Sequence, residues 1–493
     1  MKFEPQEFAV DDSPVVVDGD PTAAWRPLFR HSCEFDRQVF LAVMLNLIQN
    51  PNINSSWLFR ADILHDEPEP QTCTTAPGVE RDPSNPSFAG FELRRRIVRR
   101  LVPRNTLRDN PLDQTCLVYE SAPGHGTQTL VVYLPHVSAP SEMPFYHPVV
   151  RGIAFLHEWA AGAAEESRGS ISISYLFFDA AGRSVAKSTR TAFHLLEVIH
   201  KHGRGRQAGY QKRVHHDLIV PQARVQNTYT RLKQKYARDL IKGWAESTDP
   251  NKHVFEDLCI AAFLMELWAD MYIEGPFPGF VDIGCGNGLL VHILNQEGYA
   301  GWGFDARRRK SWAAYNTKLR TAGGAEKDTL RELVLLPSPV GREEPTALDE
   351  SRIHDGRLPK GTFIISNHAD ELTPWTPIIA VMSECPFIAI PCCSHSLTGA
   401  RYRAPAPKDK TKADSAYSSL VAWVESIARD CGWEPELEML RIPSTRNAAV
   451  IGRKRSSKSS SLDIQAIVNR YGGTAGYLDN VMKLVAAPSA HEH

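Results

Sequence analysis

The sequence has 493 residues, of which 42% are apolar and 23% charged, and its formal net charge is −1. A chain of this length can bury a large core in more than one domain. The near-zero charge excludes a uniformly basic nucleic-acid binder, and the apolar stretch 259–265 is too short to span a bilayer. The acidic, polar start does not resemble a signal peptide, so we expect a soluble, intracellular protein.

The first part of the sequence predicts an α+β domain over 36–245, after a loosely ordered stretch over 1–35. Residues 36–49 have the pattern of an amphipathic helix, and 65–90 have the composition of a loop. Apolar or alternating runs then predict strands, and a helical pattern follows them. The predicted strands are 117–119, 129–133 and 171–178, and the helix is 191–200. A charged helix over 222–243 completes this domain.

The second domain is expected over 246–455, where strands and helices alternate. An apolar helix over 254–272 leads into predicted strands at 280–283, 302–304, 333–336, 362–366 and 387–390, with helices at 289–296 and 310–321. This alternation predicts a doubly wound, mostly parallel α/β sheet, a Rossmann-like fold. No helix separates the last strands, 436–440 and 448–452, so we expect an antiparallel edge hairpin.

Residues 456–493 are expected to form a linker and a short helical tail. The basic run 453–458 (RKRSSK) fits a linker, a nuclear signal or an RNA contact.

A glycine-rich turn follows the first strand of the second domain. A side chain on this turn would keep a bulky ligand from the backbone, which explains the glycines. In residues 282–288 (DIGCGNG) the glycines are spaced Gly-x-Gly-x-Gly. This spacing differs from the Gly-x-Gly-x-x-Gly of dinucleotide-binding dehydrogenases and resembles the first motif of class I methyltransferases. Asp305, 23 residues beyond Asp282 at the end of the second strand, can accept hydrogen bonds from ribose hydroxyls. We therefore predict an S-adenosylmethionine site, with a ligand-free tight turn as the alternative. Its predicted residues are Asp282, Gly284, Cys285, Gly286, Asn287, Gly288, Asp305 and Asn367.

The acceptor is expected beyond the strand 362–366, which leads into 367–375 (NHADELTPW). Asn367 would lie beside the cofactor, and His368, Asp370 and Glu371 are the candidate catalytic residues. A carboxylate there can orient a hydroxyl or remove its proton. The alternative, which is compatible with that role, is that Asp370 and Glu371 serve as N-cap and first-turn acids of a helix that starts near Thr373.

Nine cysteines are scattered along the sequence, with neither a Cys-x-x-Cys pair nor a Cys/His finger spacing. This argues against disulfides and against a structural zinc site. The one compact group, 392–395 (CCSH), is spaced too tightly for an ordinary tetrahedral zinc site. We expect no metal, and we interpret this group as a wall of the acceptor pocket.

Basic residues gather in two places that could contact phosphates. Seven arginines fall between Arg94 and Arg108, and 307–310 (RRRK) directly follows Asp305. Such runs can supply RNA contacts or simply form solvated surface. The candidate RNA-binding residues are Arg95, Arg99, Arg100, Arg104, Arg308 and Lys310.

Several blocks resemble one family. They are 50–56 (NPNINSS), 99–105 (RRLVPRN), 229–237 (YTRLKQKYA), 249–257 (DPNKHVFED), 282–288 (DIGCGNG), 305–312 (DARRRKSW), 367–375, 391–395 (PCCSH) and 441–447 (RIPSTRN). Together they resemble the eukaryotic tRNA (uracil-2′-O-)-methyltransferases that modify uridine 44 of serine tRNAs. The resemblance implies S-adenosylmethionine as cofactor, tRNA as partner and a cytoplasmic role in tRNA processing. Some members carry a C-terminal Cys/His zinc finger, but this sequence has no cysteine after Cys431.

Two rival interpretations remain open at this point. The enzyme could methylate another RNA position or a protein, or the chain could be a non-catalytic RNA-binding protein that keeps the fold as a scaffold.

Overall fold

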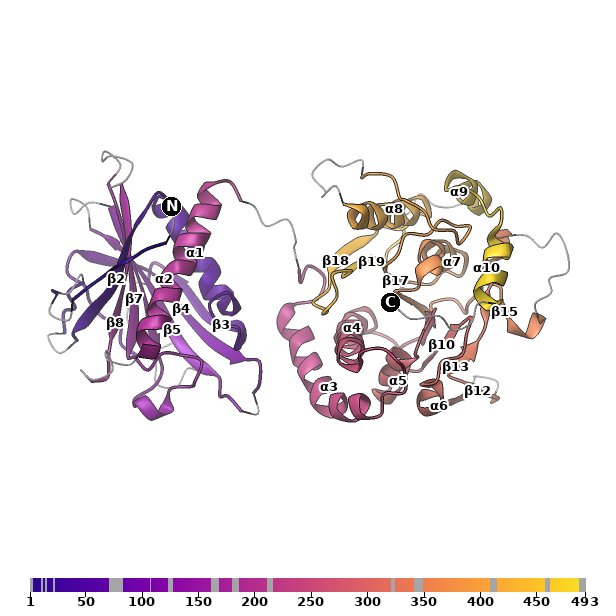
Figure 1. Ribbon diagram of the computed structural model, residues 1–493, viewed down its shortest axis with the longest axis horizontal. Coiled ribbons are helices and arrows are strands. Elements are labelled where there is room, and N and C mark those ends of the chain that lie inside the picture. The colour runs from indigo at the N-terminus through magenta and orange to yellow at the C-terminus, as the bar shows by residue number, and fades with distance from the viewer. Residues whose placement is uncertain are drawn as a thin grey trace. The chain divides into compact units, whose positions relative to one another are not determined.

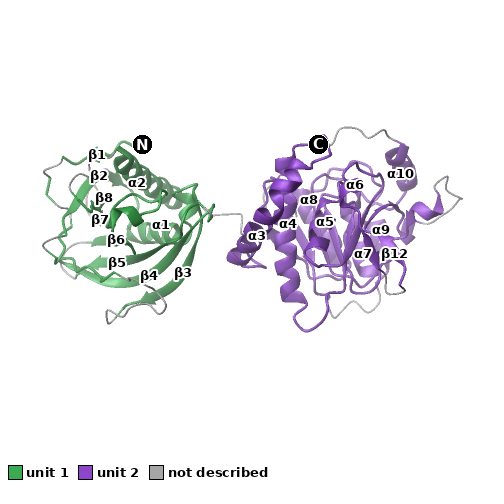
Figure 2. Ribbon diagram, turned by 90° about the horizontal axis from the view of Figure 1, so that it is seen from below, with its two compact units in different colours: residues 1–212 green, residues 213–493 purple. Residues whose placement is uncertain are grey.

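The computed structural model describes residues 3–9, 12–13, 16–20, 23–70, 83–106, 108–122, 127–160, 168–179, 186–210, 216–320, 324–340, 349–407, 415–456 and 462–486. The chain divides into two compact units, Met1–Lys212 and Arg213–His493, coloured separately in Figure 2. Among the described residues, no helix combines the length and apolarity needed to cross a membrane.

The first unit is built on an eight-stranded antiparallel sheet that curves around two helices (Figure 2). Its strand order is β1-β2-β8-β7-β6-β5-β4-β3. The strands are β1 (Gln6–Glu7), β2 (Trp25–Cys33), β3 (Leu58–Pro68), β4 (Phe91–Pro103), β5 (Leu112–Ser121), β6 (Thr127–Pro135), β7 (Gly152–Trp159) and β8 (Gly169–Leu176). Helices α1 (Arg37–Gln49) and α2 (Ala186–Gln207) pack their apolar residues, such as Phe40 and Leu196, into the core that the sheet encloses.

The predicted α+β class and the two helices of this unit are confirmed. Asp36 caps α1 by accepting a hydrogen bond from the Val39 amide at 2.9 Å. Two expectations were wrong. Strand β2 lies within the stretch 1–35 that we expected to be loosely ordered, and the loop expected over 65–90 begins later, because β3 runs to Pro68. Residues 71–82 of that loop lie outside the described residues.

The boundary between the units lies at 212/213 rather than at 245. Helix α3 (Gln222–Lys242) belongs to the second unit, because its buried residues, among them Leu232 and Leu240, share a core with helix α4 (Pro250–Met271). The many charges of α3 obscured this apolar stripe in the sequence.

The second unit contains a seven-stranded sheet of order β13-β10-β9-β16-β17-β19-β18. The strands are β9 (Phe280–Ile283), β10 (Gly301–Asp305), β13 (Leu330–Glu332), β16 (Phe363–Asn367), β17 (Phe387–Ile390), β18 (Glu436–Met439) and β19 (Ala448–Gly452). The first five pair in parallel, whereas β19 pairs antiparallel with both β17 and β18. The predicted doubly wound sheet with an antiparallel edge hairpin is confirmed.

Helices cover both faces of this sheet (Figure 1). Successive residues along each strand point to opposite faces. Phe280 of β9 and Phe363 of β16 pack with α3, α4 and α5 (Leu289–Gln296). On the other face, Val281 and Ile364 pack with α7 (Thr376–Met382), α8 (Ala416–Asp430), α9 (Ile464–Arg470) and α10 (Tyr477–Ala486). The predicted helical tail is therefore part of the core, while 487–493 lies outside the described residues.

The helix expected over 310–321 is much shorter. Helix α6 (Trp312–Tyr315) gives way to the pair β11 (Lys318–Arg320) and β12 (Glu326–Asp328). Asn316 ends the helix and accepts a hydrogen bond from the Leu330 amide at 3.0 Å. The third strand is consequently β13 rather than 333–336, where β14 (Val334–Leu335) pairs with β15 (Ile353–His354).

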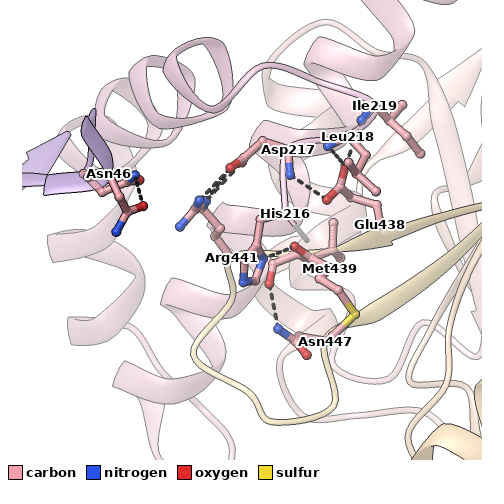
Figure 3. A network of polar contacts seen from close by, with 11 residues as sticks. Asn46, His216, Asp217, Leu218, Ile219, Glu438, Met439, Arg441 and Asn447 are labelled. Carbon is pink, nitrogen blue, oxygen red and sulfur yellow. Dashed lines mark hydrogen bonds and ion pairs between the residues drawn. The ribbon is translucent and has the colours of Figure 1, made fainter. Parts of the chain in front are cut away.

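The start of the second unit is fastened to the edge hairpin (Figure 3). Glu438 of β18 accepts hydrogen bonds from the amides of Asp217, Leu218 and Ile219 at 2.8, 2.8 and 2.9 Å. Arg441 donates to both carboxylate oxygens of Asp217. A carboxylate that accepts several backbone amides fixes the chain there.

Candidate active site

The three glycines after β9 occupy the left-handed region of backbone conformation, with φ of 74° at Gly284, 51° at Gly286 and 75° at Gly288. A Cβ at Gly288 would lie 2.5 Å from the Leu330 side chain, so this glycine also serves packing. A Cβ at Gly286 would meet no described atom within 4 Å. Open space beside a bare backbone is what a ligand needs in order to approach the turn.

A cavity lies beside this turn at the carboxyl ends of the parallel strands, where open α/β sheets bind ligands. Its polar side includes Gly284, Gly286, Asp305, Arg307, His368 and Glu371. Its apolar side includes Leu333, Val334, Val481 and Leu484. The glycine turn, the end of β10 and the segment after β16 thus meet around one space, as we expected from the sequence.

Asp305 stands on the wall of this cavity at the end of β10. Its two carboxylate oxygens accept hydrogen bonds from the backbone amides of Gly286 and Arg307, each at 3.1 Å. These bonds fix the carboxylate and leave it further acceptor capacity. A fixed carboxylate with spare lone pairs can bind the two hydroxyls of a ribose.

Cys285 and Asn287, also predicted at the cofactor site, use their side chains structurally. The Cys285 side chain is buried in the core between the sheet and its helices. The Asn287 side chain accepts a hydrogen bond from the Leu289 amide at 2.8 Å, at the start of α5. Neither residue is among the described residues that line the cavity.

Behind the turn lies a group of buried acidic and amide side chains. Asn367 of β16 donates to Asp257 of α4 at 3.4 Å, and Asp282 of β9 is almost fully buried. Within the described residues, Asp282 Oδ1 and Asn367 Oδ1 have no hydrogen-bond partner. Buried acceptors without a donor are costly, and a bound cation relieves that cost.

The raised pKa values of the carboxyl groups behind the turn also indicate a site for a positive group. Burial, with a smaller contribution from the nearby charge of Glu256, raises the pKa of Asp257 to about 8, against the opposing hydrogen bond from Asn367. Burial and the charges of Asp257 and Asp305 raise the pKa of Asp282. A positive group bound here would favour the charged carboxylates.

Sequence analysis missed Glu256 and Asp257. They belong to the block 249–257, but we gave them no role there. Two adjacent acids that end up buried within the apolar helix 254–272 were the available signal.

His368 is held in an unusual conformation by a contact with α4. Its φ is 52°, and Asp370 has a φ of 42°, so two of three consecutive residues after β16 are left-handed. Strain of this kind gathers at functional sites. His368 Nε2 lies 3.0 Å from Glu256 Oε1, and its buried Nδ1 lacks a hydrogen-bond partner among the described residues. If Nε2 carries the proton that Glu256 accepts, Nδ1 is free to accept another.

Asp370 and Glu371 lie beside His368 on the cavity lining. Both fall in the first turn of the 3-10 helix η7 (Asp370–Trp375), as the alternative expected of first-turn acids. The N-cap is Ala369 without a side-chain cap, so the expectation of an acidic N-cap was wrong. Burial raises the pKa of Glu371 to about 7. Glu371 can therefore exchange a proton near neutral pH.

The Cys392 thiol donates a hydrogen bond to Asp370 at 3.1 Å. Ligand atoms of Asp370, Cys392 and Cys393 all lie within 4.8 Å of one another. Our spacing argument against a metal considered only the segment 392–395 and did not foresee that Asp370 joins the two cysteines. The thiol–carboxylate hydrogen bond already accounts for the contact. Asp370 lines the cavity, but 392–395 are not among its described lining residues, so their place as a wall of the acceptor pocket stays a prediction.

Most of the arginine-rich stretch lies in strand β4, and its side chains differ in burial and in their partners. Arg99 is only 4% exposed and donates to Gln114 and to the Ile48 carbonyl, both at 2.6 Å. Arg99 was therefore wrongly predicted as an RNA contact, because its charge is used inside the first unit. Arg95 and Arg100 pair with Asp66 and Asp113, each at 2.7 Å.

The other predicted RNA-binding residues are exposed. Arg104 donates to the Ser56 carbonyl at 2.8 Å. Arg308 and Lys310 are exposed, while the intervening Arg309 and the preceding Arg307 line the cavity. Positive charge thus follows Asp305 directly and lies next to the glycine turn.

Comparisons with known proteins cover both units. Residues 5–213 match the family model "TRM44-like, N-terminal bet v1-like domain", and residues 219–326 match "Predicted AdoMet-dependent methyltransferase". These boundaries agree with the division of the structure at 212/213.

Relatives described as tRNA (uracil-O(2)-)-methyltransferase align along nearly the whole chain. The Neurospora crassa protein is 63% identical, with 100% of this chain and 99% of the relative aligned. The Schizosaccharomyces pombe protein is 38% identical over 99% of this chain and 97% of its own, and the Yarrowia lipolytica protein 37% identical over 97% and 100%. No solved structure matches the chain significantly.

Proposed function

Since the chain belongs to the tRNA (uracil-O(2)-)-methyltransferase family, we propose that the uridine it methylates is residue 44 of serine tRNAs. Membership supports the coarser activity, an S-adenosylmethionine-dependent methylation of a uridine ribose 2′-hydroxyl in tRNA. The finer assignment is supported by the blocks 305–312 and 367–375, which resemble the family acting on that position. The observation that carries the proposal is that both blocks border the same cavity.

The residues around the glycine turn fit S-adenosylmethionine. Gly286 faces open space, and Asp305 presents a fixed carboxylate for the ribose hydroxyls. Asp282 and Asn367 offer unsatisfied buried acceptors for the ammonium group of the methionine end, and Asp257 adds a buried carboxylate bonded to Asn367. When bound, the cofactor supplies an activated methyl group on its sulfonium, so the protein mainly has to align the acceptor.

His368 is our candidate for the base that takes the proton of the 2′-hydroxyl. Glu256 accepts from one ring nitrogen and so orients the other as an acceptor, the arrangement that activates histidine bases. Asp370 and Glu371, on the same cavity lining, are the candidates for orienting the ribose. Glu256 does not touch the substrate in this scheme and acts as a positioning residue.

Nucleoside mass spectrometry tests the proposal. Purified protein incubated with S-adenosylmethionine and total tRNA should produce 2′-O-methyluridine, and fragment mapping should place it at position 44 of serine tRNAs. A uridine-to-cytidine change at that position in a serine tRNA transcript is the matched control. Methylation at another position would refute the finer assignment, and methylated protein without methylated RNA would refute both.

A further inference from the structure

The C-terminal helix α10 contributes directly to the cofactor cavity. Tyr477, Val481 and Leu484 lie one turn apart on one face of α10 and line the same space as Gly286 and Asp305. This helix lies far along the chain from the glycine turn and beyond the segment 219–326 that matches the methyltransferase model. Sequence analysis assigned the tail no role.

Several contacts fix α10 in that position. Tyr477 is only 1% exposed, and its hydroxyl donates to the Leu335 carbonyl at 2.8 Å. Its ring packs edge-on against Trp375, with ring centroids 5.7 Å apart. Asn480 donates to the Thr398 carbonyl at 2.9 Å. Because α10 is bound to β14 and to the segments after β16 and β17, Val481 and Leu484 form a fixed wall.

The order of groups along the cavity decides which part of the cofactor meets this wall. Asp305 marks the ribose position, and the buried acceptors around Asp282 mark the methionine end. The adenine must therefore lie on the other side of the ribose. In the sheet order, β13 lies across β10 from β9, so Leu333 and Val334, which follow β13, lie across Asp305 from Asp282. The bond from Tyr477 to Leu335 brings α10 beside them. Val481 and Leu484 line the cavity together with Leu333 and Val334, and such apolar side chains suit the flat, largely apolar face of a base.

We propose that Val481 and Leu484 form one wall of the adenine subsite, so that the C-terminal helix is part of the cofactor site. This inference rests on the placement of S-adenosylmethionine given under the proposed function. It predicts that the tail contributes to affinity through the nucleoside and not through the methionine group.

Calorimetric titration of the full-length chain with three ligands tests this assignment. S-adenosylmethionine and S-adenosylhomocysteine carry both ends of the cofactor, whereas 5′-methylthioadenosine lacks the amino acid. The test variant is Val481→Ala/Leu484→Ala. Val485→Ala is the matched control, because Val485 lies on the same helix, packs against the apolar core and is not on the cavity lining. Thermal melting checks that each variant is folded.

The double variant should bind all three ligands about tenfold more weakly than the wild type, the range expected when two buried apolar contacts are shortened, and Val485→Ala should bind them normally. Equal affinities in the double variant and the control would overturn the proposal. Weaker binding of the two amino-acid ligands alone would also overturn it, because the wall would then face the methionine end. If the wild type bound none of the three ligands, the placement of the cofactor itself would fail.

Discussion

The glycine turn of the second unit and the arginine-rich strand of the first differ in how far local sequence decides function. In the turn, backbone conformation follows from the glycines, and the open space beside Gly286 lies where the motif predicts it. Seven arginines in and just after β4 suggested a binding surface, but alternate strand positions face opposite sides of a sheet. Arg99 is consequently buried, and Arg95 and Arg100 are paired with acids. The function of a motif that acts through its own backbone can be predicted from the local sequence. The role of a charge cluster depends on the residues that surround it in the folded protein.

The largest expected effect tests the glycine turn. Gly286→Leu should abolish measurable S-adenosylmethionine binding, more than about 100-fold, because the side chain enters the ligand's space and strains a left-handed position. Gly298→Leu is the control, since Gly298 also has a positive φ and free space but lies off the cavity lining. Calorimetry measures both variants. Similar binding loss in the two would mean that backbone strain alone is responsible.

Substitutions of His368 and Glu256 test whether the left-handed segment after β16 takes part in catalysis. His368→Ala should lower kcat about 100-fold or more, the usual contribution of a general base, with little change in cofactor affinity. Glu256→Gln should lower kcat less than His368→Ala does and should shift the pH dependence of kcat. The glutamine amide can still orient the imidazole ring but lacks the negative charge of the Glu256 carboxylate. Single-turnover methylation at several pH values measures this. An unchanged pH profile in Glu256→Gln would exclude the positioning role.

Asp257 should distinguish the two ends of the cofactor. Asp257→Asn should weaken S-adenosylmethionine and S-adenosylhomocysteine binding about tenfold and leave 5′-methylthioadenosine binding unchanged, because only the first two carry the ammonium group. Asp270→Asn is the control, since Asp270 is an exposed acid on the same helix. Equal losses for all three ligands would place Asp257 elsewhere in the site.

The same substitution should stabilise the ligand-free protein at alkaline pH. The pKa of Asp257 rises from 3.8 to about 8 on folding, so the folded protein keeps a proton that the unfolded chain has lost between these values. Its stability therefore falls as pH rises through that window. Asp257→Asn should raise the melting temperature at pH 8 by at least about 2–4 °C, the shift that 1 kcal/mol produces in a domain of this size. The gain should vanish near pH 4, and calorimetric melting at both pH values measures it.

The smallest effects concern RNA contacts. Arg308→Ala/Lys310→Ala should weaken tRNA binding and reduce the slope of log affinity against log salt concentration by about 1–2. Each phosphate contact releases counterions on binding, so fewer are released when two contacts are lost. Arg99→Ala should leave that slope unchanged and lower the melting temperature of the first unit, because it leaves Gln114 and two carbonyls without their donor. A changed slope in Arg99→Ala would show that burial does not keep this residue from the RNA.

The sequence alone determined the α/β class of the second unit, its edge hairpin, the glycine turn with Asp305, and the segment after β16. These depend on strand and helix patterns and on backbone conformation, which are local properties. It did not reveal the boundary at 212/213, the burial of Arg99, the Glu256–His368 contact or the role of α10. Each of these joins residues distant in the sequence. Hydrophobic packing of α3, α4 and α10 against the sheet brings those of the second unit together, and the packing of α1 on the first sheet brings Arg99 to the Ile48 carbonyl. Tertiary structure therefore decided which charges are free and which helices complete the site.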